Sequence, residues 1–384
     1  MTPPDESRLE AESRFVQREV VLLIVLALAA LGAFQLTRTV ASREQRATIR
    51  DAAAWYDTGV RQLQDGRVDD AVIALRHATS RDRENRTYVT ALARALVAAG
   101  RRDDAKVALL ELRDSAPEDP LTNVELARLA AERRDVTEAA RYYRNALYGV
   151  WNGERAADRA SLHIEFIRFL LASRQPSIAL AELLALVPNL PDDAAAHLQA
   201  GQLLLAAGDA GRARAQCERA LAIKPRNREA LGCAGEAAFV TGDYAAVGHL
   251  LGAMTAPSPR LADLRELSAL ILASDPLAPR LATVERWRRL VAAVAQAADH
   301  LDECRATATS PSVDAGARLE TLRSEADAFE PVLAKGHRAS PDEIEAGAAL
   351  VYRIEQAVAD ACGAPVGLDQ ALLINGRRHG AQTP

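Results

Sequence analysis

A pattern of small residues recurs along this chain at intervals of 34 residues. One small or apolar residue begins each unit, at Gly59, Ala93, Ala127, Ile167, Gly201 and Gly235. A second follows twelve residues later, at Ala71, Ala105, Ala139, Ala179, Ala213 and Val247. The interval is broken once, by a six-residue insertion at 151–156. Because only 4% of the residues are aromatic and alanine supplies much of the apolar content, the pattern predicts closely packed helices rather than sheets.

Proline ends four of the six units, at Pro117, Pro191, Pro225 and Pro259. The first unit carries Trp55, Gly59, Gly66, Ala71 and Ala78, but has Arg83 in place of the proline. In length and in these positions, residues 52–260 resemble the tetratricopeptide repeat family. The resemblance implies a solenoid of antiparallel helix pairs, in which each pair buries its apolar face only against its neighbours.

The segment from Val20 to Leu36 is apolar except for Gln35, and as a helix it is at the short end for crossing a bilayer. We interpret it as an uncleaved membrane anchor. A cleaved signal peptide is the alternative, but the preceding region is long and acidic, and no A-x-A site follows. The basic residues on either side slightly favour a cytoplasmic C-terminal domain, whereas a short tail before one early anchor favours translocation of that domain.

The C-terminal part has apolar residues at helical spacing in three stretches, separated by short segments rich in Ser, Pro and Gly. The third stretch begins with Ser340 as N-cap, Pro341 in the first turn and Glu343 completing a capping box. We therefore expect an all-α protein with an N-terminal transmembrane helix, a solenoid of about six tetratricopeptide repeats and a small C-terminal helical bundle. The expected divisions are a tail (1–19), a transmembrane helix (20–36), a helical stalk (37–51), the solenoid (52–260), a capping helix and linker (261–277), a three-helix bundle (278–363) and a tail (364–384).

The four cysteines fall into two pairs. Cys217 and Cys233 are equally distant from Pro225 in an antiparallel helix pair, and Cys304 and Cys362 end the apolar stripes of two helices expected to be parallel. Two disulfides would indicate an oxidising compartment, and the alternative is that each cysteine is a small core residue. On this basis we expect a single-pass protein of the bacterial inner membrane with its C-terminal domain in the periplasm.

No familiar catalytic or ligand-binding motif is present. The chain has no C-x-x-C, P-loop, H-E-x-x-H or G-x-S-x-G sequence, and its seven histidines are scattered. The formal net charge is −5 and no basic block indicates a nucleic-acid partner. We expect no catalytic residue, no cofactor, no metal and no nucleic acid.

The family resemblance also implies a concave surface lined by the first helix of each repeat. Carried over to this sequence, the expected partner-binding residues are Arg94, Val97, Arg128, Arg168, Leu171, Leu205 and Phe239. A row of arginines beside an apolar stripe suits a segment that bears carboxylates. The alternative is that an arginine-rich chain places arginine on any solvated face.

These features predict a non-catalytic, membrane-anchored scaffold that binds protein subunits and stabilises or assembles a larger bacterial membrane complex. By analogy with the family, that complex could be an electron-transport or photosynthetic one, although no residue selects between them. The alternative is a transient periplasmic adaptor or chaperone that holds client segments in the concave groove.

Overall fold

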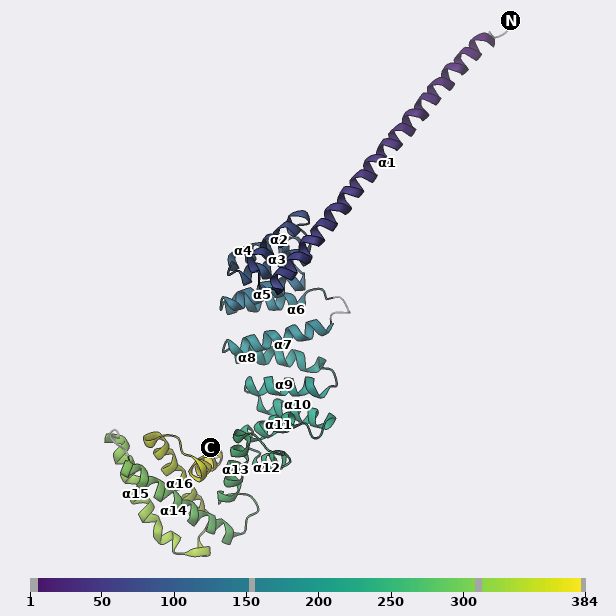
Figure 1. Ribbon diagram of the computed structural model, residues 1–384. Helices are drawn as coiled ribbons and strands as arrows, with labels where there is room; N and C mark the ends of the chain where they lie inside the picture. The colour runs from purple at the N-terminus through teal and green to yellow at the C-terminus, as the bar shows by residue number, and fades with distance from the viewer. Residues whose placement is uncertain (1–5, 152–155, 308–312, 381–384) are drawn as a thin grey trace. The chain divides into compact units, whose positions relative to one another are not determined.

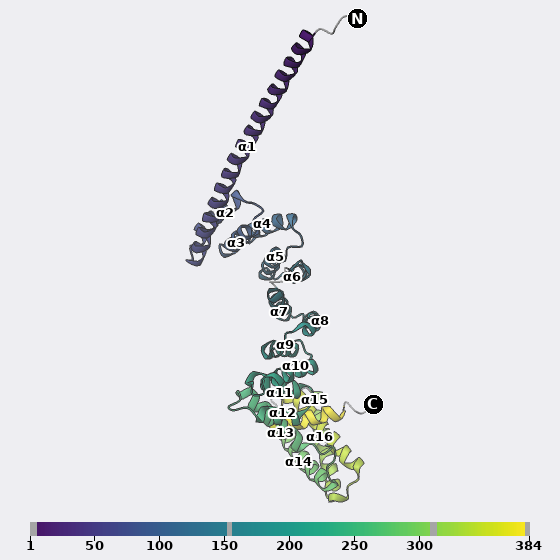
Figure 2. The ribbon, with the colours of Figure 1, turned by 90° about the vertical axis from the view of Figure 1, so that its right-hand side faces the viewer.

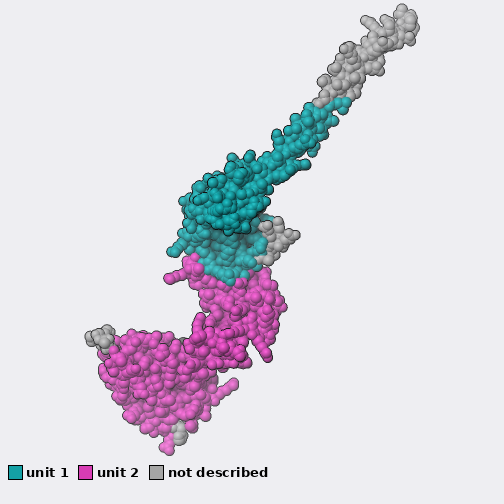
Figure 3. All heavy atoms as spheres, in the orientation of Figure 1, with its two compact units in different colours: residues 1–169 teal, residues 170–384 magenta. Residues whose placement is uncertain are grey.

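The chain is described by a computed structural model that covers residues 6–151, 156–307 and 313–380, with the side chains of residues 6–27, 29, 30, 156, 157, 313 and 337 outside the described part. Over these residues it consists of α-helices and short 3₁₀ helices, without strands. It forms two compact units, Met1–Phe169 and Leu170–Pro384, which are coloured separately in Figure 3.

Unit 1 holds three helix pairs and most of a seventh helix (Figure 1). These helices are α1 (Glu6–Gln64), α2 (Val68–Arg81), α3 (Arg86–Ala98), α4 (Arg102–Ser115), α5 (Pro120–Glu132), α6 (Val136–Tyr148) and α7 (Ala156–Ala172), whose last residues belong to unit 2. Between α1 and α6, each helix contacts the one that follows it, from α1 with α2 to α5 with α6, and the first helices of neighbouring pairs, α1 with α3 and α3 with α5, are also in contact. This is the packing expected of stacked helix–turn–helix repeats.

Unit 2 continues with the later repeats and the C-terminal helices. Its repeat helices are α8 (Pro176–Leu186), α9 (Ala194–Ala206), α10 (Ala210–Ile223), α11 (Arg228–Val240) and α12 (Tyr244–Gly252). They are followed by α13 (Pro259–Ser274), α14 (Thr283–Thr307), α15 (Val313–Leu333), α16 (Pro341–Cys362) and α17 (Gly367–Gly380), with 3₁₀ helices at Val187–Asn189 and Gly336–Arg338.

The repeat positions identified in the sequence are the places where the helices meet. All six residues of the second set, from Ala71 to Val247, are completely buried. A side chain at Gly201 or Gly235 has no room, because an added Cβ would lie 2.3 Å from Cys217 Sγ or 2.4 Å from Leu251 Cδ2. In these two repeats the close approach of the two helices therefore requires glycine at this position.

The turn within each repeat places one residue in the left-handed region. Gly66, Gly100, Gly208 and Gly242 have φ between 76° and 89° at equivalent positions. In the third and fourth repeats the same position holds Arg134 and Arg174, with φ of 60° and 56°. A non-glycine residue is strained in this conformation, so these two turns depart from the optimum of the other four.

Polar caps start many of the helices. Asp119, Asp209, Asn227 and Asp243 each accept a hydrogen bond from a backbone N–H in the first turn of the helix that follows. The capping box predicted at Ser340 is confirmed, since Glu343 N donates to Ser340 Oγ at 3.2 Å and Ser340 N donates to Glu343 Oε2 at 2.9 Å. Each first turn thereby gains partners for N–H groups that the helix itself leaves unpaired.

Helix α1 is continuous from Glu6 to Gln64 and includes residues 37–51, the expected stalk. Its part before Ala52 extends away from the rest of unit 1 (Figures 1 and 2). Nearly all side chains between 31 and 51 are exposed. Most side chains of the expected transmembrane segment 20–36 lie outside the described part of the chain. Among the residues that were described, no helix has the length and apolar character needed to cross a membrane.

The prediction of a tail at 364–384 was wrong for most of these residues, because residues 367–380 form helix α17. Its residues Ala371, Leu372 and Leu373 are buried, and the helix contacts α13, α14 and α16. The C-terminal module therefore contains four helices, α14 to α17, rather than three. Gly376 allows α17 to pack closely against α16, since a Cβ on it would lie 2.4 Å from Tyr352 Cδ2.

Candidate functional site

A groove with a volume of about 270 Å³ lies in unit 1 and is lined largely by the first helices of the second, third and fourth repeats. Its apolar lining consists of Leu121, Val124, Trp151 and Leu162. Trp151 belongs to the insertion that interrupts the repeat, and its Nε1 donates to Ala146 O at 2.8 Å. The groove therefore combines repeat residues with one residue of the insertion.

Along this groove, arginines and glutamates alternate in a row that we call the ion ladder: Arg94, Glu125, Arg128 and Glu165. Arg94 Nε donates to Glu125 Oε1 at 3.0 Å. Arg128 holds Glu165 in a bidentate pair, with Nε–Oε1 at 2.8 Å and Nη2–Oε2 at 2.7 Å, and its Nη1 lies 3.5 Å from Glu125 Oε1. Tyr143 adds a hydrogen bond from its hydroxyl to Glu165 Oε1 at 3.0 Å.

The repeat itself produces this ladder. Glu125 and Glu165 occupy the same position in successive repeats, as do Arg94 and Arg128. Each arginine therefore reaches the glutamate of the following repeat, 31 or 37 residues further along the chain. In the next repeat the equivalent position is Gln199, so the pattern of carboxylates ends there.

Within the ion ladder, the interaction between Arg128 and Glu165 keeps both side chains charged. The hydrogen bond from Arg128 holds the pKa of the Glu165 carboxyl below its usual range, and burial only partly opposes it. The same hydrogen bond raises the pKa of Arg128. Burial, followed by the nearby charge of Glu165, raises the pKa of Tyr143, so its hydroxyl remains a donor. The ladder thus carries two positive and two negative charges, and its formal sum is zero.

Two of the three expected groove arginines therefore already have carboxylate partners. Arg94 and Arg128 are exposed but engaged in the ladder, and Val97 is half-buried. Arg168 is also exposed, and the described residues provide no ion pair for it. Glu125 and Glu165 were not among the groove residues expected from the sequence. The signal that points to Glu125 is its place three residues before Arg128, a spacing that puts both on one helix face.

The remaining expected groove residues lie in unit 2. Leu171 is half-buried. Leu205 lines a second groove, with a volume of about 430 Å³, between α9, α11 and the start of α13. Phe239 packs against Tyr244, with ring centroids 5.4 Å apart in an edge-on arrangement, and against the cluster around Ile271. Its ring contributes to the internal packing of this unit.

The cysteines are joined in the two pairs considered from the sequence. Cys217 and Cys233 connect α10 to α11, with Cα atoms 6.0 Å apart. Cys304 and Cys362 connect α14 to α16, with Cα atoms 5.9 Å apart. Both separations are usual for disulfides. Within the described residues, the groove of unit 1 holds no cluster of histidine, cysteine and carboxylate groups suited to a metal ion.

Comparison with solved structures finds similar helical proteins of low identity. A tetratricopeptide repeat protein from Parabacteroides merdae has 12% identity and a TM-score of 0.38, over 63% of this chain and 92% of the other. The pilF protein of Pseudomonas aeruginosa has 16% identity and a TM-score of 0.39, over 53% and 90%. PilW, a type IV pilus biogenesis factor, has 14% identity and a TM-score of 0.37, over 52% and 90%. At these values the likeness supports no functional inference.

Comparison with curated protein sequences gives no match. Two family models described as tetratricopeptide repeats match separate parts of the chain, one at residues 62–122 and the other at residues 168–228. Both segments coincide with stacked helix pairs whose repeat positions are buried. Over these residues, the chain consists of tetratricopeptide repeats.

Proposed function

We propose that this protein is a non-catalytic, membrane-anchored scaffold that uses its tetratricopeptide repeats to bind protein subunits of a larger bacterial membrane complex. The observation that carries the proposal is the groove of unit 1, in which an apolar lining adjoins the ion ladder. Apolar side chains supply binding energy, and rows of donors and acceptors orient a peptide segment. A binding role requires no reactive group at this site.

The ladder changes the expected chemistry of the partner. Since Arg94 and Arg128 are already neutralised by Glu125 and Glu165, a partner carboxylate would have to displace a glutamate from a pair with short, bidentate hydrogen bonds. We infer that the groove favours a segment with apolar side chains and little net charge. Arg168, which has no ion pair in the described residues, is the arginine best suited to a direct contact.

Photo-crosslinking in cells of the native host tests the groove. A photoreactive residue at Leu121, which lies in the groove, should crosslink to specific proteins. The matched control is the same residue at Val107, which is exposed on α4 outside this groove. We expect defined products from Leu121 alone, identified by mass spectrometry. Equal products from both positions would contradict a specific groove.

A pair of variants distinguishes two roles of the ion ladder: keeping the groove neutral, or binding a partner carboxylate directly through Arg128. Arg128→Ala leaves Glu165 without its main partner, whereas Glu125 keeps Arg94, so partner crosslinking should fall by at least about 10-fold because an unpaired acid then faces the groove. Adding Glu165→Gln removes that unpaired acid and should restore much of the crosslinking. If Arg128 instead binds a partner carboxylate directly, both variants lose crosslinking equally, and the expectation of a neutral partner is wrong.

The membrane anchor is supported by the apolar run at 20–36 and by the exposure of Leu28, Leu31, Phe34 and Leu36 on α1. Large apolar side chains exposed along one helix are costly in water and indicate a surface that another phase or protein covers. The full chain should remain with membranes after carbonate extraction, and a variant lacking residues 1–36 should be released. Release of the full chain would refute the anchor.

The periplasmic location is supported by the two disulfides, which persist in oxidising compartments. Alkaline phosphatase fused after residue 384 should be active. A reporter that is active only in the cytoplasm, fused at the same place, should be inactive. Rapid acid quenching of cells followed by thiol alkylation should leave the four cysteines unmodified. Labelling of all four would place the domain in a reducing compartment.

A further inference from the structure

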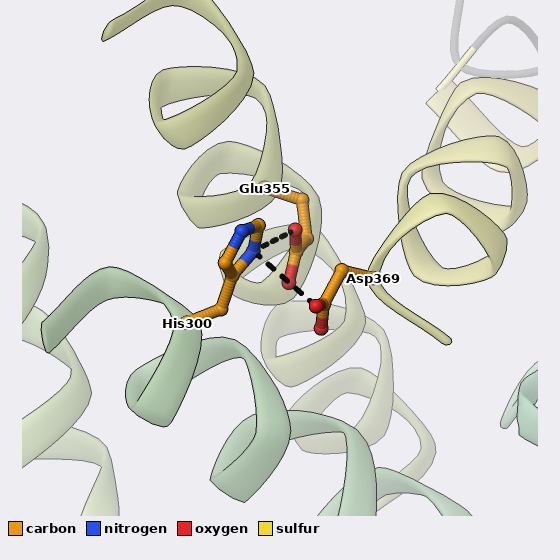
Figure 4. Close-up of side chains that lie close together, drawn as sticks. All are labelled: His300, Glu355 and Asp369. Carbon is orange, nitrogen blue, oxygen red and sulfur yellow. Dashed lines mark hydrogen bonds and ion pairs between the residues drawn. The ribbon is translucent and has the colours of Figure 1, made fainter. Parts of the chain in front are cut away.

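Three helices of the C-terminal module bring a histidine and two carboxylates together (Figure 4). His300 comes from α14, Glu355 from α16 and Asp369 from the first turn of α17. His300 Nδ1 lies 2.8 Å from Glu355 Oε2 and 3.8 Å from Asp369 Oδ2. One ligand atom from each residue lies within 4.8 Å of the other two. The three residues are 55 and 14 positions apart in the chain, and no sequence motif joins them.

Glu355 is the unusual member of this cluster. Its side chain is completely buried, and its Oε1 has no hydrogen-bond partner among the described residues. A buried carboxylate oxygen without a partner is costly, and native proteins rarely leave one in that state. Figure 4 shows the carboxylates of Glu355 and Asp369 both directed toward the imidazole of His300.

The surroundings hold the other two residues in place. His300 and Asp369 are largely buried, with side chains 18% and 19% exposed. Gln296, one turn before His300 on α14, donates from Nε2 to Asp369 Oδ1 at 2.9 Å. This hydrogen bond leaves Asp369 Oδ2 directed toward His300, as a supporting residue does for a metal ligand.

We propose that His300, Glu355 and Asp369 bind a divalent zinc ion. An imidazole nitrogen and two carboxylate oxygens are a suitable ligand set for zinc, with water completing the coordination. Bonds of about 2.0–2.2 Å at tetrahedral angles place ligand atoms about 3.4 Å apart, between the two distances from His300 Nδ1. Small rotations of the side chains would therefore suffice to receive the ion.

Binding would connect α14, α16 and α17 at one point. The last of these also packs against α13, the helix that follows the final repeat. The ion would thus stabilise the attachment of α17, whose burial the sequence did not predict. The competing occupant is a proton, because burial raises the pKa of the Glu355 carboxyl to about 7.

Zinc binding to the purified full chain in detergent tests the proposal. After treatment with EDTA and removal of the chelator, titration with zinc at pH 7.5 should show one site, confirmed by elemental analysis after gel filtration. Hydrogen exchange in α17 should slow on addition of zinc. Both disulfides should be kept oxidised, so that no free thiol competes for the metal.

Two variants decide the assignment. Glu355→Gln keeps the shape of the side chain and removes its buried charge, so the variant should fold, lose zinc binding by at least about 10-fold and show no zinc-dependent slowing in α17. His379→Ala is the matched control, because His379 also lies on α17 and pairs with a carboxylate, Asp275, at 3.0 Å. Unchanged zinc binding in Glu355→Gln, equal loss in His379→Ala, or no zinc bound by the wild-type chain would overturn the proposal.

Discussion

The disulfide between Cys304 and Cys362 is the cross-link whose loss should change stability most. It closes a segment of 58 residues, whereas the bridge between Cys217 and Cys233 closes one of 16. A cross-link lowers the entropy of the unfolded chain, and the effect grows with the logarithm of the closed length. The chain-entropy relation gives about 4 kcal/mol for the longer segment and about 3 kcal/mol for the shorter one at 25 °C.

The two bridges also differ in access to a reductant. Cys362 is exposed, although Cys304 is only 3% exposed. Cys217 and Cys233 are 0% and 6% exposed in the packed repeat. A small phosphine should therefore reduce the bridge between Cys304 and Cys362 in the native protein and leave the other bridge intact, because attack requires access to a sulfur atom.

Hydrogen exchange measured by mass spectrometry would follow the stability of both bridged helix pairs, α14 with α16 and α10 with α11, in the same sample, with EDTA present throughout. Selective reduction should accelerate exchange of the slowest amides in α14 and α16 by up to about 1000-fold, which corresponds to about 4 kcal/mol. Exchange in α10 and α11 should stay the same. A variant with Cys304→Ala and Cys362→Ala should behave like the reduced protein and no longer respond to the phosphine.

Two results would refute this reasoning. If the bridge is reduced and the protection of α14 and α16 falls by less than about 1 kcal/mol, loop closure does not stabilise the bundle. If both bridges are reduced at the same rate in the native protein, the difference in exposure does not control access.

Two further predictions concern unit 1. Arg134→Gly should stabilise it by about 1 kcal/mol, because glycine accepts a φ of 60° without strain, and Gly100→Ala should destabilise it by a similar amount; equal urea midpoints for both variants would contradict this. The lowered pKa of Glu165 contributes stability above the usual pKa of a glutamate, and this contribution is lost as the pH falls through the lower value in the folded state. Urea unfolding followed from pH 6 to pH 3 should show a steeper acid loss in the wild type than in Arg128→Ala.

The repeats were predictable because their determinants are local and periodic. A buried residue, usually a small one, stands where the two helices of a repeat touch, and this requirement recurs every 34 residues outside the insertion, as the complete burial of Ala71 and Ala105 shows. The capping box at Ser340 was predictable for the same reason, since its partners are three residues apart. In both cases neighbours in the chain are neighbours in space.

The ion ladder could have been found in part. Its four residues repeat with the period of the fold, so aligning the glutamates as well as the arginines would have placed Glu125 and Glu165 beside Arg94 and Arg128. Their bidentate geometry and their hydrogen bond to Tyr143 depend on how the helices stack, which the period alone does not specify.

By itself, the sequence determined that this chain is helical, where its repeats begin and which cysteines could be joined, because each of these follows from spacing along the chain. Only the tertiary structure decided that residues 367–380 are a packed helix and that His300, Glu355 and Asp369 meet. Those contacts join helices whose separation in the chain follows no period. They exist because apolar faces of α13, α14, α16 and α17 must be buried together, and burial then brings the polar side chains within reach of one another.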